Sequence, residues 1–221
     1  MGVVVAMDGP SGSGKSSTSR CVATRLGMRY LDTGAMYRAM TWWLLEHGVD
    51  VDDPEAVAAH ADRPRLVSGS DPQAPTITVD GTDVSGPIRG RKVTAAVSAV
   101  SAVPGIRERL LHEQHAIIGD GDIVVEGRDI GTVVAPDAEV KVFLTADPGA
   151  RAVRRAAEQA GSDVAATQQD LIRRDAFDSG RAASPLVMAA DAHHIDTTPY
   201  TLDEVVEQVV ALVEGVRSPG S

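Results

Sequence analysis

One stretch near the N-terminus decides the fold: Val3-Val4-Val5-Ala6-Met7-Asp8-Gly9-Pro10-Ser11-Gly12-Ser13-Gly14-Lys15-Ser16. Residues 3–7 form a continuous apolar run, which is typical of a central parallel strand buried on both faces. Residues 9–16 fit the pattern G-x-x-x-x-G-K-[ST] without a mismatch, and a helical stretch follows from Lys15 to about Leu26. A strand, a glycine-rich loop and a helix in this order predict a loop that binds nucleotide phosphates.

The chemistry of this loop follows from its residue types. Its glycines allow successive backbone N–H groups to point inward at phosphate oxygens, and the following helix adds the positive end of its dipole. Lys15 supplies a positive charge to the β- and γ-phosphates, and the hydroxyl of Ser16 can ligate Mg²⁺. We therefore assign residues Gly9 to Ser17 to ATP binding. A dinucleotide fingerprint is excluded, because Ser17 stands where its third glycine is required.

Strands and helices alternate along the rest of the chain. A short strand at 28–31 precedes a helix from Thr33 to about His47, and another helix begins at 53–54. Residues 63–90 differ, because prolines, glycines and an alternating run at 76–79 predict a small β insert. The later elements that we expect are helical sequence at 88–118 broken near Pro104, strands at 123–125 and 140–144, an arginine-rich helix after Asp147-Pro148, a mobile polar segment at 161–185, a strand ending at Ile195, and a helix from Thr201 to about Val216. This alternation predicts a parallel sheet with helices on both sides.

The composition narrows the class of protein. The chain has 221 residues and a net charge of -10, which indicates one domain, or one domain with a small insert, and argues against non-specific nucleic-acid binding. It contains no Asn, which removes the base-reading Asn of a typical GTPase and the metal-binding Asn of a protein kinase. The single Cys21 cannot form an internal disulfide, no apolar run is long enough to span a bilayer, and no signal-peptide core is present. We therefore expect a soluble cytoplasmic protein.

Charged side chains gather around the predicted strand ends. Glu126 follows the apolar strand 123–125, and Arg128 and Asp129 come directly after it. A joint site for a nucleoside triphosphate and a phosphorylated acceptor has to neutralise about six negative charges, and dispersed arginines on movable elements suit that task. The D-x-x-G pattern that begins at Asp83 lies in the predicted insert with no long apolar strand before it, so we interpret it as a coincidental match.

Three smaller patterns favour structural roles. Trp42-Trp43 and Met36-Met40 are expected to pack their helix against the core, and Cys21 is expected to be a small buried hydrophobe. The pair His193-His194 invites a metal-binding interpretation, but adjacent residues of an extended segment point to opposite faces. We therefore expect no metal site there.

The sequence also resembles a known family, the bacterial cytidylate kinases among the nucleoside monophosphate kinases. The resemblance covers nearly the whole chain. The matching motifs are M-D-G-P-S-G-S-G-K-S at 7–16, L-D-T-G-A-M-Y-R at 31–38, D-V-S-G-P-I-R at 83–89, V-E-G-R-D-I-G-T-V-V at 125–134 and R-R-D-A-F-D-S-G-R-A-A-S-P-L at 173–186. Glu126 stands where some members have Asp, which keeps the charge.

The resemblance implies an α/β fold of the phosphate-loop NTPase type: a three-layer sandwich with a five-stranded parallel sheet in the order 2-3-1-4-5. It implies a core at 1–62, 97–150 and 186–217, an NMP-binding insert at 63–96 and a short lid at 151–185. It also implies that ATP, with Mg²⁺, phosphorylates CMP and dCMP to CDP and dCDP by in-line transfer.

Roles for individual residues come with the same resemblance. It implies that the CMP phosphate is held by Arg38, Arg128 and Arg181, that the cytosine meets Ser98, Arg107 and Asp129, and that the sugar meets Arg174 and Asp178. Asp32 and Thr33 complete this CMP-binding set. Of the lid arginines, Arg154 is expected to contact ATP phosphates, so the catalytic set is Lys15, Arg128, Arg154 and Arg181. For Mg²⁺, Ser16 is the expected ligand, with Glu126 or Asp32 acting through water.

Two alternatives stay open. The nearer one is another small-molecule kinase, such as a UMP or AMP kinase. The other is a nucleotide-dependent switch or binding module. We expect a monomer whose partners are ATP and CMP or dCMP, with no nucleic-acid or membrane partner.

Overall fold

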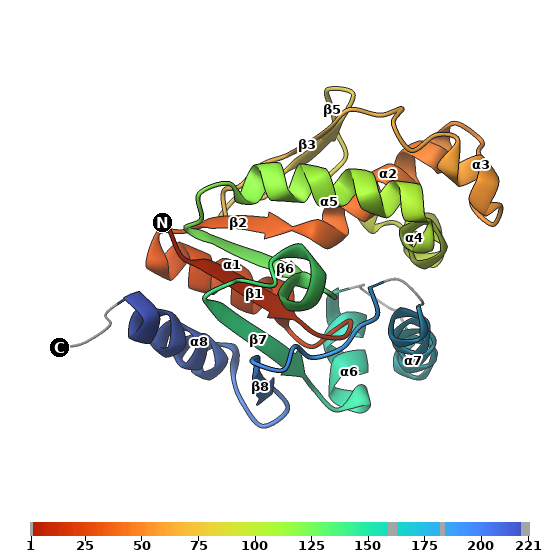
Figure 1. Cartoon of the computed structure of the whole chain (residues 1–221). Coiled ribbons are helices and arrows are strands. Elements are labelled where there is room, and N and C mark those ends of the chain that lie inside the picture. The colour runs from red at the N-terminus through yellow and green to blue at the C-terminus, as the bar shows by residue number, and fades with distance from the viewer. Residues whose placement is uncertain (1, 159–162, 182–183, 218–221) are drawn as a thin grey trace. The chain divides into compact units, whose positions relative to one another are not determined.

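The structure is a computed structural model that describes residues 2–158, 163–181 and 184–217. The chain divides into two compact units, which are described separately (Figure 1). Unit 1 comprises Met1–Met28 and Asp120–Ser221, and unit 2 comprises Arg29–Gly119.

The large sheet has five strands in the order β2-β6-β1-β7-β8. Their bounds are β1 Val4–Asp8, β2 Arg29–Asp32, β6 Ile123–Gly127, β7 Val140–Thr145 and β8 His193–Asp196. Numbered along the chain among themselves, these strands have the order 2-3-1-4-5, so the predicted parallel α/β fold and its strand order are confirmed. The register places Asp8 opposite Gly127, so the carboxyl ends of β1 and β6 lie side by side.

In unit 1 the apolar run of β1 lies in the core: Val5, Ala6 and Met7 are all fully buried. The helices are α1 Lys15–Leu26, α6 Pro148–Glu158, α7 Val164–Gly180 and α8 Leu202–Arg217, with a short helical segment η2 at Ile130–Val134. Helix α1 packs against β1, β6 and α8. The predicted capping box of α8 is confirmed, because the Glu204 carboxylate accepts from the Thr201 backbone N–H and the Thr201 hydroxyl accepts from the Glu204 N–H.

Unit 2 contains α2 Thr33–Glu46, α3 Pro54–Ala58, the 3₁₀ turn η1 Pro87–Arg89, α4 Arg91–Ala102 and α5 Pro104–Ile118. Its three short strands, β3 Leu66–Ser68, β4 Ile77–Val79 and β5 Thr82–Asp83, form an antiparallel sheet. This sheet confirms the β structure predicted for the insert. The hairpin between β4 and β5 turns at Asp80-Gly81, where both residues have positive φ. The predicted break at Pro104 separates α4 from α5.

One helix was not predicted, and one expectation needs correction. In the polar segment 161–185, which we expect to be mobile, α7 occupies Val164–Gly180, and the Asp163 carboxylate caps its N-terminus by accepting from the Ala166 N–H at 2.7 Å. Residues 161–162 and 182–183 of that segment lie outside the described part of the chain. Cys21 was expected to be buried, but it is exposed, because it lies on the outer face of α1.

The expected packing of α2 is confirmed for Met36, Met40 and Trp43, which are 1%, 0% and 9% exposed, whereas Trp42 is only half-buried. No helix in the described residues is long and apolar enough to cross a membrane.

Candidate nucleotide-binding site

The phosphate loop, residues 9–16, has the backbone that its glycines predict. Gly9 has φ +144, and a Cβ atom there would lie 2.0 Å from the Leu144 carbonyl oxygen, so no other residue fits. Gly14 has φ +90 and directly precedes α1. Lys15 is only 6% exposed, and its ammonium group bends back across the loop to donate to the Pro10 carbonyl at 2.9 Å. The lysine charge is therefore held at the centre of the loop, where a phosphate can replace the carbonyl as its acceptor.

Ser16 and Glu126 form a pair of oxygen groups beside this loop. The Ser16 hydroxyl donates to the Glu126 carboxylate at 2.9 Å, and Glu126 is 3% exposed at the end of β6. Mg²⁺ prefers oxygen ligands and keeps several waters, so one hydroxyl and one nearby carboxylate fit its requirements. Within the described residues, no group of three or more His, Cys, Asp and Glu could hold a metal ion by itself.

Next to the loop, Asp8 is the last residue of β1 and is 5% exposed. Its two carboxylate oxygens accept from the backbone N–H groups of Ile130 and Gly131, both at 2.8 Å. Burial raises the pKa of Asp8 from 3.8 to about 6, and the two N–H groups oppose this shift.

An α7 arginine cluster, which we define as Arg128, Arg174 and Arg181 with Asp175 and Asp178, lies within unit 1. The Arg128 guanidinium donates to the Asp178 carboxylate at 3.1 Å, and Arg181 donates to the Asp178 carbonyl at 3.4 Å. Burial first, and then the charge of Arg128, lower the pKa of Arg174 to about 10. Among the described residues, the buried Nε of Arg174 has no hydrogen-bond partner. The positive charges of the three arginines lie close together, and this arrangement favours the binding of an anion such as a phosphate group.

Helix α6 connects the phosphate loop with this cluster. The Arg151 guanidinium donates to the Ser11 carbonyl in the loop at 3.1 Å and also forms an ion pair with Asp175 on α7. Arg154 donates to the hydroxyl and carbonyl of Thr197, both at 2.9 Å, and the Thr197 hydroxyl donates to the Ser13 carbonyl at 3.1 Å. Both arginines are thereby fixed at the loop by their neighbours.

Unit 2 carries the remaining candidates. Arg38 on α2 donates to the Ile88 carbonyl at 3.2 Å and to the Thr94 hydroxyl at 2.9 Å. Asp32 caps α2 by accepting from the Ala35 N–H at 2.9 Å, and its other oxygen lies 3.7 Å from Arg89. Thr33, the first residue of α2, is 4% exposed.

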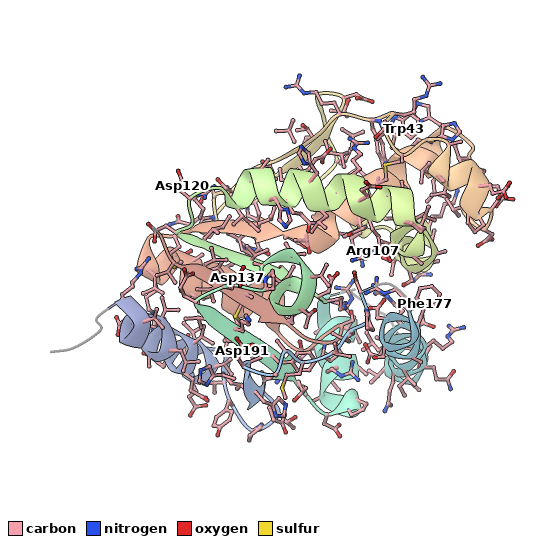
Figure 2. The ribbon with its side chains drawn as sticks, viewed as in Figure 1. Trp43, Arg107, Asp120, Asp137, Phe177 and Asp191 are labelled. Atoms are coloured by element: carbon pink, nitrogen blue, oxygen red, sulfur yellow. The ribbon has the colours of Figure 1, made fainter. Side chains whose placement is uncertain are left out.

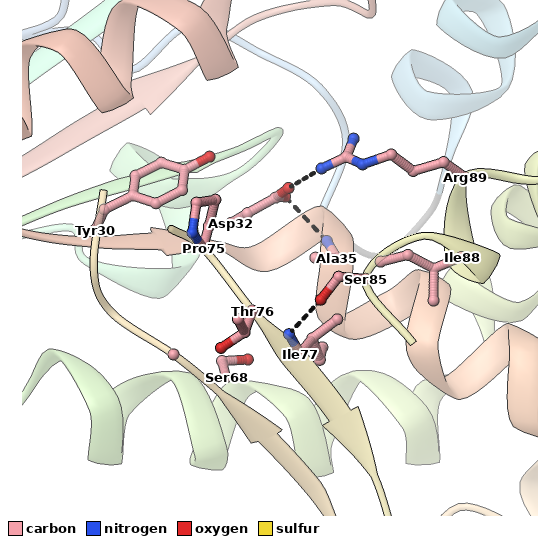
Figure 3. A pocket seen from close by; sticks show the side chains of 11 residues that line it. Tyr30, Asp32, Ala35, Ser68, Pro75, Thr76, Ile77, Ser85, Ile88 and Arg89 are labelled. Carbon is pink, nitrogen blue, oxygen red and sulfur yellow. Dashed lines mark hydrogen bonds and ion pairs between the residues drawn. The ribbon is translucent and has the colours of Figure 1, made fainter. Parts of the chain in front are cut away.

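A small pocket opens beside Asp32 (Figure 3). The paired Asp32 and Arg89 line it, and both polar and apolar side chains complete the lining: Tyr30, Pro75, Thr76, Ile77, Ser85 and Ile88. A pocket of mixed character therefore adjoins the start of α2 within unit 2.

Ser98 and Arg107 come from α4 and α5, and Ser101 links them. Arg107 donates to the Ser101 carbonyl at 3.2 Å, and the Ser101 hydroxyl donates to the Ser98 carbonyl at 2.9 Å. The Arg107 guanidinium lies over the Tyr37 ring, 5.6 Å from its centroid, near the start of α5 (Figure 2). This arrangement holds the guanidinium plane in a fixed orientation.

Comparison with known proteins gives the family. A family model described as cytidylate kinase matches residues 5–215. The chain belongs to the cytidylate kinase family. A cytidylate kinase from Streptomyces griseus is 61% identical over 217 residues, which are 97% of this chain and 94% of that protein. A cytidylate kinase from Streptomyces coelicolor is 59% identical over 218 residues, which are 98% of this chain and 94% of that protein.

A solved structure supports the fold alone. It is an uncharacterised protein from Eubacterium ventriosum with 10% sequence identity, and the match has a TM-score of 0.53 and covers 96% of this chain and 98% of that chain.

The structure places four further polar residues at or beside the contacts of the phosphate loop. They received no role from the sequence in this cytidylate kinase family member: Asp8, Arg151, Asp175 and Thr197. Asp8 could have been found from its position, because ligand-binding residues of parallel sheets gather at the carboxyl ends of strands. Arg151 could have been found from its spacing, because it shares one face of α6 with Arg154 at i, i+3. Asp175 lies within the motif at 173–186 but received no role from it, and Thr197 lies in none of the matching motifs.

Proposed function

We propose that the chain transfers the γ-phosphoryl group of ATP to CMP and dCMP, forming ADP with CDP or dCDP. Membership of the cytidylate kinase family supports this reaction. The structural observation that carries the proposal is the contact of Arg151 with both Ser11 and Asp175, because it joins the phosphate loop to the half-buried α7 arginine cluster within unit 1. A donor site and a site for a second anion are then neighbours, as phosphoryl transfer requires.

In this proposal, residues Gly9 to Ser17 bind the ATP phosphates. Lys15 and Arg154 face the charge that develops on the transferring group, and Arg128 and Arg181 hold the CMP phosphate together with Arg38. The acceptor is already a phosphate oxygen anion, so no general base is needed. Catalysis then consists of positioning and charge stabilisation.

Mg²⁺ would be held by Ser16, with Glu126 or Asp32 acting through water. When bound, it would neutralise charge on the ATP phosphates. The hydrogen bond between the Ser16 hydroxyl and the Glu126 carboxylate, at 2.9 Å, supports Glu126 in this role.

For the nucleoside, we assign Ser98, Arg107 and Asp129 to the cytosine and Arg174 and Asp178 to the sugar, with Asp32 and Thr33 at the acceptor site. Asp129 is 6% exposed, so a base bonded to it would be largely desolvated. Cytosine offers an N4 amino donor to a carboxylate, whereas uracil offers an O4 acceptor, and the second pairing leaves two acceptors opposed. Sites built on buried hydrogen bonds reject a wrong partner strongly, by up to roughly 10⁴-fold.

The test is a screen of nucleoside monophosphates with ATP and Mg²⁺, in which formation of ADP and of each nucleoside diphosphate is measured. CMP and dCMP should exceed UMP and AMP greatly in kcat/KM. Comparable or higher kcat/KM for UMP or AMP would contradict the cytosine assignment. ATP hydrolysis without transfer to any nucleotide would contradict the kinase reaction and favour a switch.

We also propose that the protein acts as a monomer in the cytoplasm, without nucleic-acid or membrane partners. The acidic net charge of -10 supports the part of this proposal that concerns nucleic acid. Light scattering coupled to gel filtration would measure the oligomeric state directly.

A further inference from the structure

The short segment η2, Ile130–Val134, follows Arg128 and Asp129 directly. It has no capping side chain of its own, since Asp129 precedes it without a side-chain hydrogen bond to it. Its first two N–H groups, from Ile130 and Gly131, donate instead to the two carboxylate oxygens of Asp8, both at 2.8 Å. A residue of β1, about 120 places earlier in the chain, therefore serves as the N-terminal cap of η2.

We propose that Asp8 is a positioning residue that fixes the backbone carrying Arg128 and Asp129, and so sets their orientation toward CMP. The inference rests on the proposed function, because it takes the acceptor-binding roles of Arg128 and Asp129 from there. Asp8 itself does not contact substrate in this scheme.

Only a carboxylate can make this cap. Both oxygens accept, whereas Asn would offer one acceptor and turn an NH₂ donor toward the other N–H group. The two groups are also in contact: a Cβ atom on Gly131 would lie at an ordinary van der Waals distance of 3.4 Å from Asp8 Oδ2, and at a tighter 3.2 Å from Lys141 Cδ. The backbone of η2 therefore packs directly onto the Asp8 carboxylate, and a change of Asp8 has to move or loosen that backbone.

Burial makes this carboxylate costly, which supports a functional reason for it. Asp8 is 5% exposed and lies near the charge of Asp129, both of which raise its pKa, while the Ile130 and Gly131 N–H groups and the charge of Lys15 lower it. A polar group that is expensive to bury and fully hydrogen-bonded gives local specificity more than stability. Here the ordered segment is the one that begins with Arg128 and Asp129.

The test compares Asp8→Asn with Asp122→Asn. Asp122 is a matched control, because its carboxylate also accepts from a backbone N–H, that of Val3, but at the opposite end of β1. Amide hydrogen exchange of the protein without nucleotides should show faster exchange of residues 128–134 in Asp8→Asn and no change there in Asp122→Asn. This measurement does not depend on the reaction.

Kinetics give the second readout. Asp8→Asn should lower kcat/KM for CMP by about 10- to 100-fold, as misplacement of a binding group by about 1 Å does. The Kd for ATP measured without CMP should change by less than about threefold, because the loop residues that we assign to ATP keep their contacts. As a second variant, Gly131→Ala keeps the carboxylate but places a methyl group tightly against Lys141 and in contact with Asp8, so that the η2 backbone has to shift. It should change the same two readouts in the same direction by less.

Unchanged exchange at 128–134 in Asp8→Asn, or in Gly131→Ala should Asp8→Asn not fold, would overturn the inference. Faster exchange with unchanged CMP kinetics would also overturn it. A loss of ATP affinity as large as the loss in kcat/KM for CMP would do the same, because it would place the effect in the phosphate loop. Failure of the wild-type protein to phosphorylate CMP would instead contradict the proposed function and remove the acceptor role of this segment, while the exchange result would still decide whether Asp8 caps η2.

Discussion

The phosphate loop and the α7 arginine cluster are built differently. The groups that we assign to ATP come from consecutive residues of the loop around one lysine. The groups of the cluster that we assign to CMP are side chains from segments about 50 residues apart. The loop has its shape from glycine backbone geometry, and Gly9 tolerates no side chain at all. The cluster has its shape from ion pairs, such as Arg128 with Asp178. An incoming anion meets a preformed loop in the first region, but in the second it has to compete with carboxylates already in place. Single substitutions should therefore act differently in the two regions.

The largest effect is expected in the loop. Lys15→Ala should lower kcat by about 10²- to 10³-fold or more, because it removes a charge aimed at the transferring phosphoryl group. Circular dichroism should show an unchanged fold, since the hydrogen bond from the lysine ammonium to the Pro10 carbonyl lies within the loop itself and joins no helix or strand to another. Lys92→Ala on the exposed face of α4 is the control and should retain full activity. Near-normal turnover of Lys15→Ala would break the comparison at its stronger side.

Asp8, where β1 leads into the loop, gives a prediction about pH and stability. The folded protein binds the Asp8 proton more tightly than the unfolded chain, because its pKa is raised from 3.8 to about 6. The resulting stabilisation is fully present below the unfolded pKa and is lost as pH rises through about 6, and it amounts to at most about 3 kcal/mol.

Asp8→Asn removes this titration. The Tm of the wild type minus that of the variant should therefore fall between about pH 4 and pH 7.5, by a few degrees per kcal/mol. Thermal unfolding at several pH values measures it. Parallel Tm curves for the two proteins would show that ionisation of Asp8 costs nothing in the folded state.

In the cluster, Arg181→Ala should lower kcat/KM for CMP by about 10- to 150-fold, the worth of one charge-assisted hydrogen bond of roughly 1.5–3 kcal/mol. Arg181→Lys should restore only part of it, because an ammonium keeps the charge but loses the planar two-pronged geometry. Steady-state kinetics with CMP and ATP varied separately provide the measurement, and ATP binding without CMP should change much less. A Tm loss of several degrees with unchanged CMP kinetics would make Arg181 a structural residue.

The same contrast explains what could be predicted from the sequence. The strand, loop and helix at residues 3–26 were predictable because motif and periodicity are local. Helix α7 was missed because its inward face consists of Thr167, Leu171 and Asp178, with only one apolar side chain among the three. Its hydrophobic periodicity is too weak to predict a helix.

The contacts of the site were harder to predict than its residues. The cap that Asp8 provides joins residues 122 positions apart, and nothing near Asp8 in sequence specifies its partner. The pairing of Arg151 with Asp175 likewise depends on how α6 and α7 pack. Residue roles could be inferred from family motifs, but such contacts required the fold.

The smallest effect is expected at Arg173, directly beside a residue for which we expect a larger one. Arg173 and Arg174 are neighbours on α7, yet the Arg173 side chain is 78% exposed and pairs only with Asp170, one turn earlier, among the described contacts. Such an exposed pair contributes at most about 1 kcal/mol.

Arg174, by contrast, is partly buried, and its pKa is lowered to about 10 by burial first and then by Arg128. Arg173→Ala should therefore change kcat/KM for CMP by less than about threefold, while Arg174→Ala, the matched variant, should lower it by about tenfold or more. Both proteins have the same net charge, so their ratio measures placement and not electrostatic attraction at long range. If the two variants lost activity equally, the cluster would act as a diffuse positive surface, and the distinction between buried and exposed arginines on α7 would be wrong.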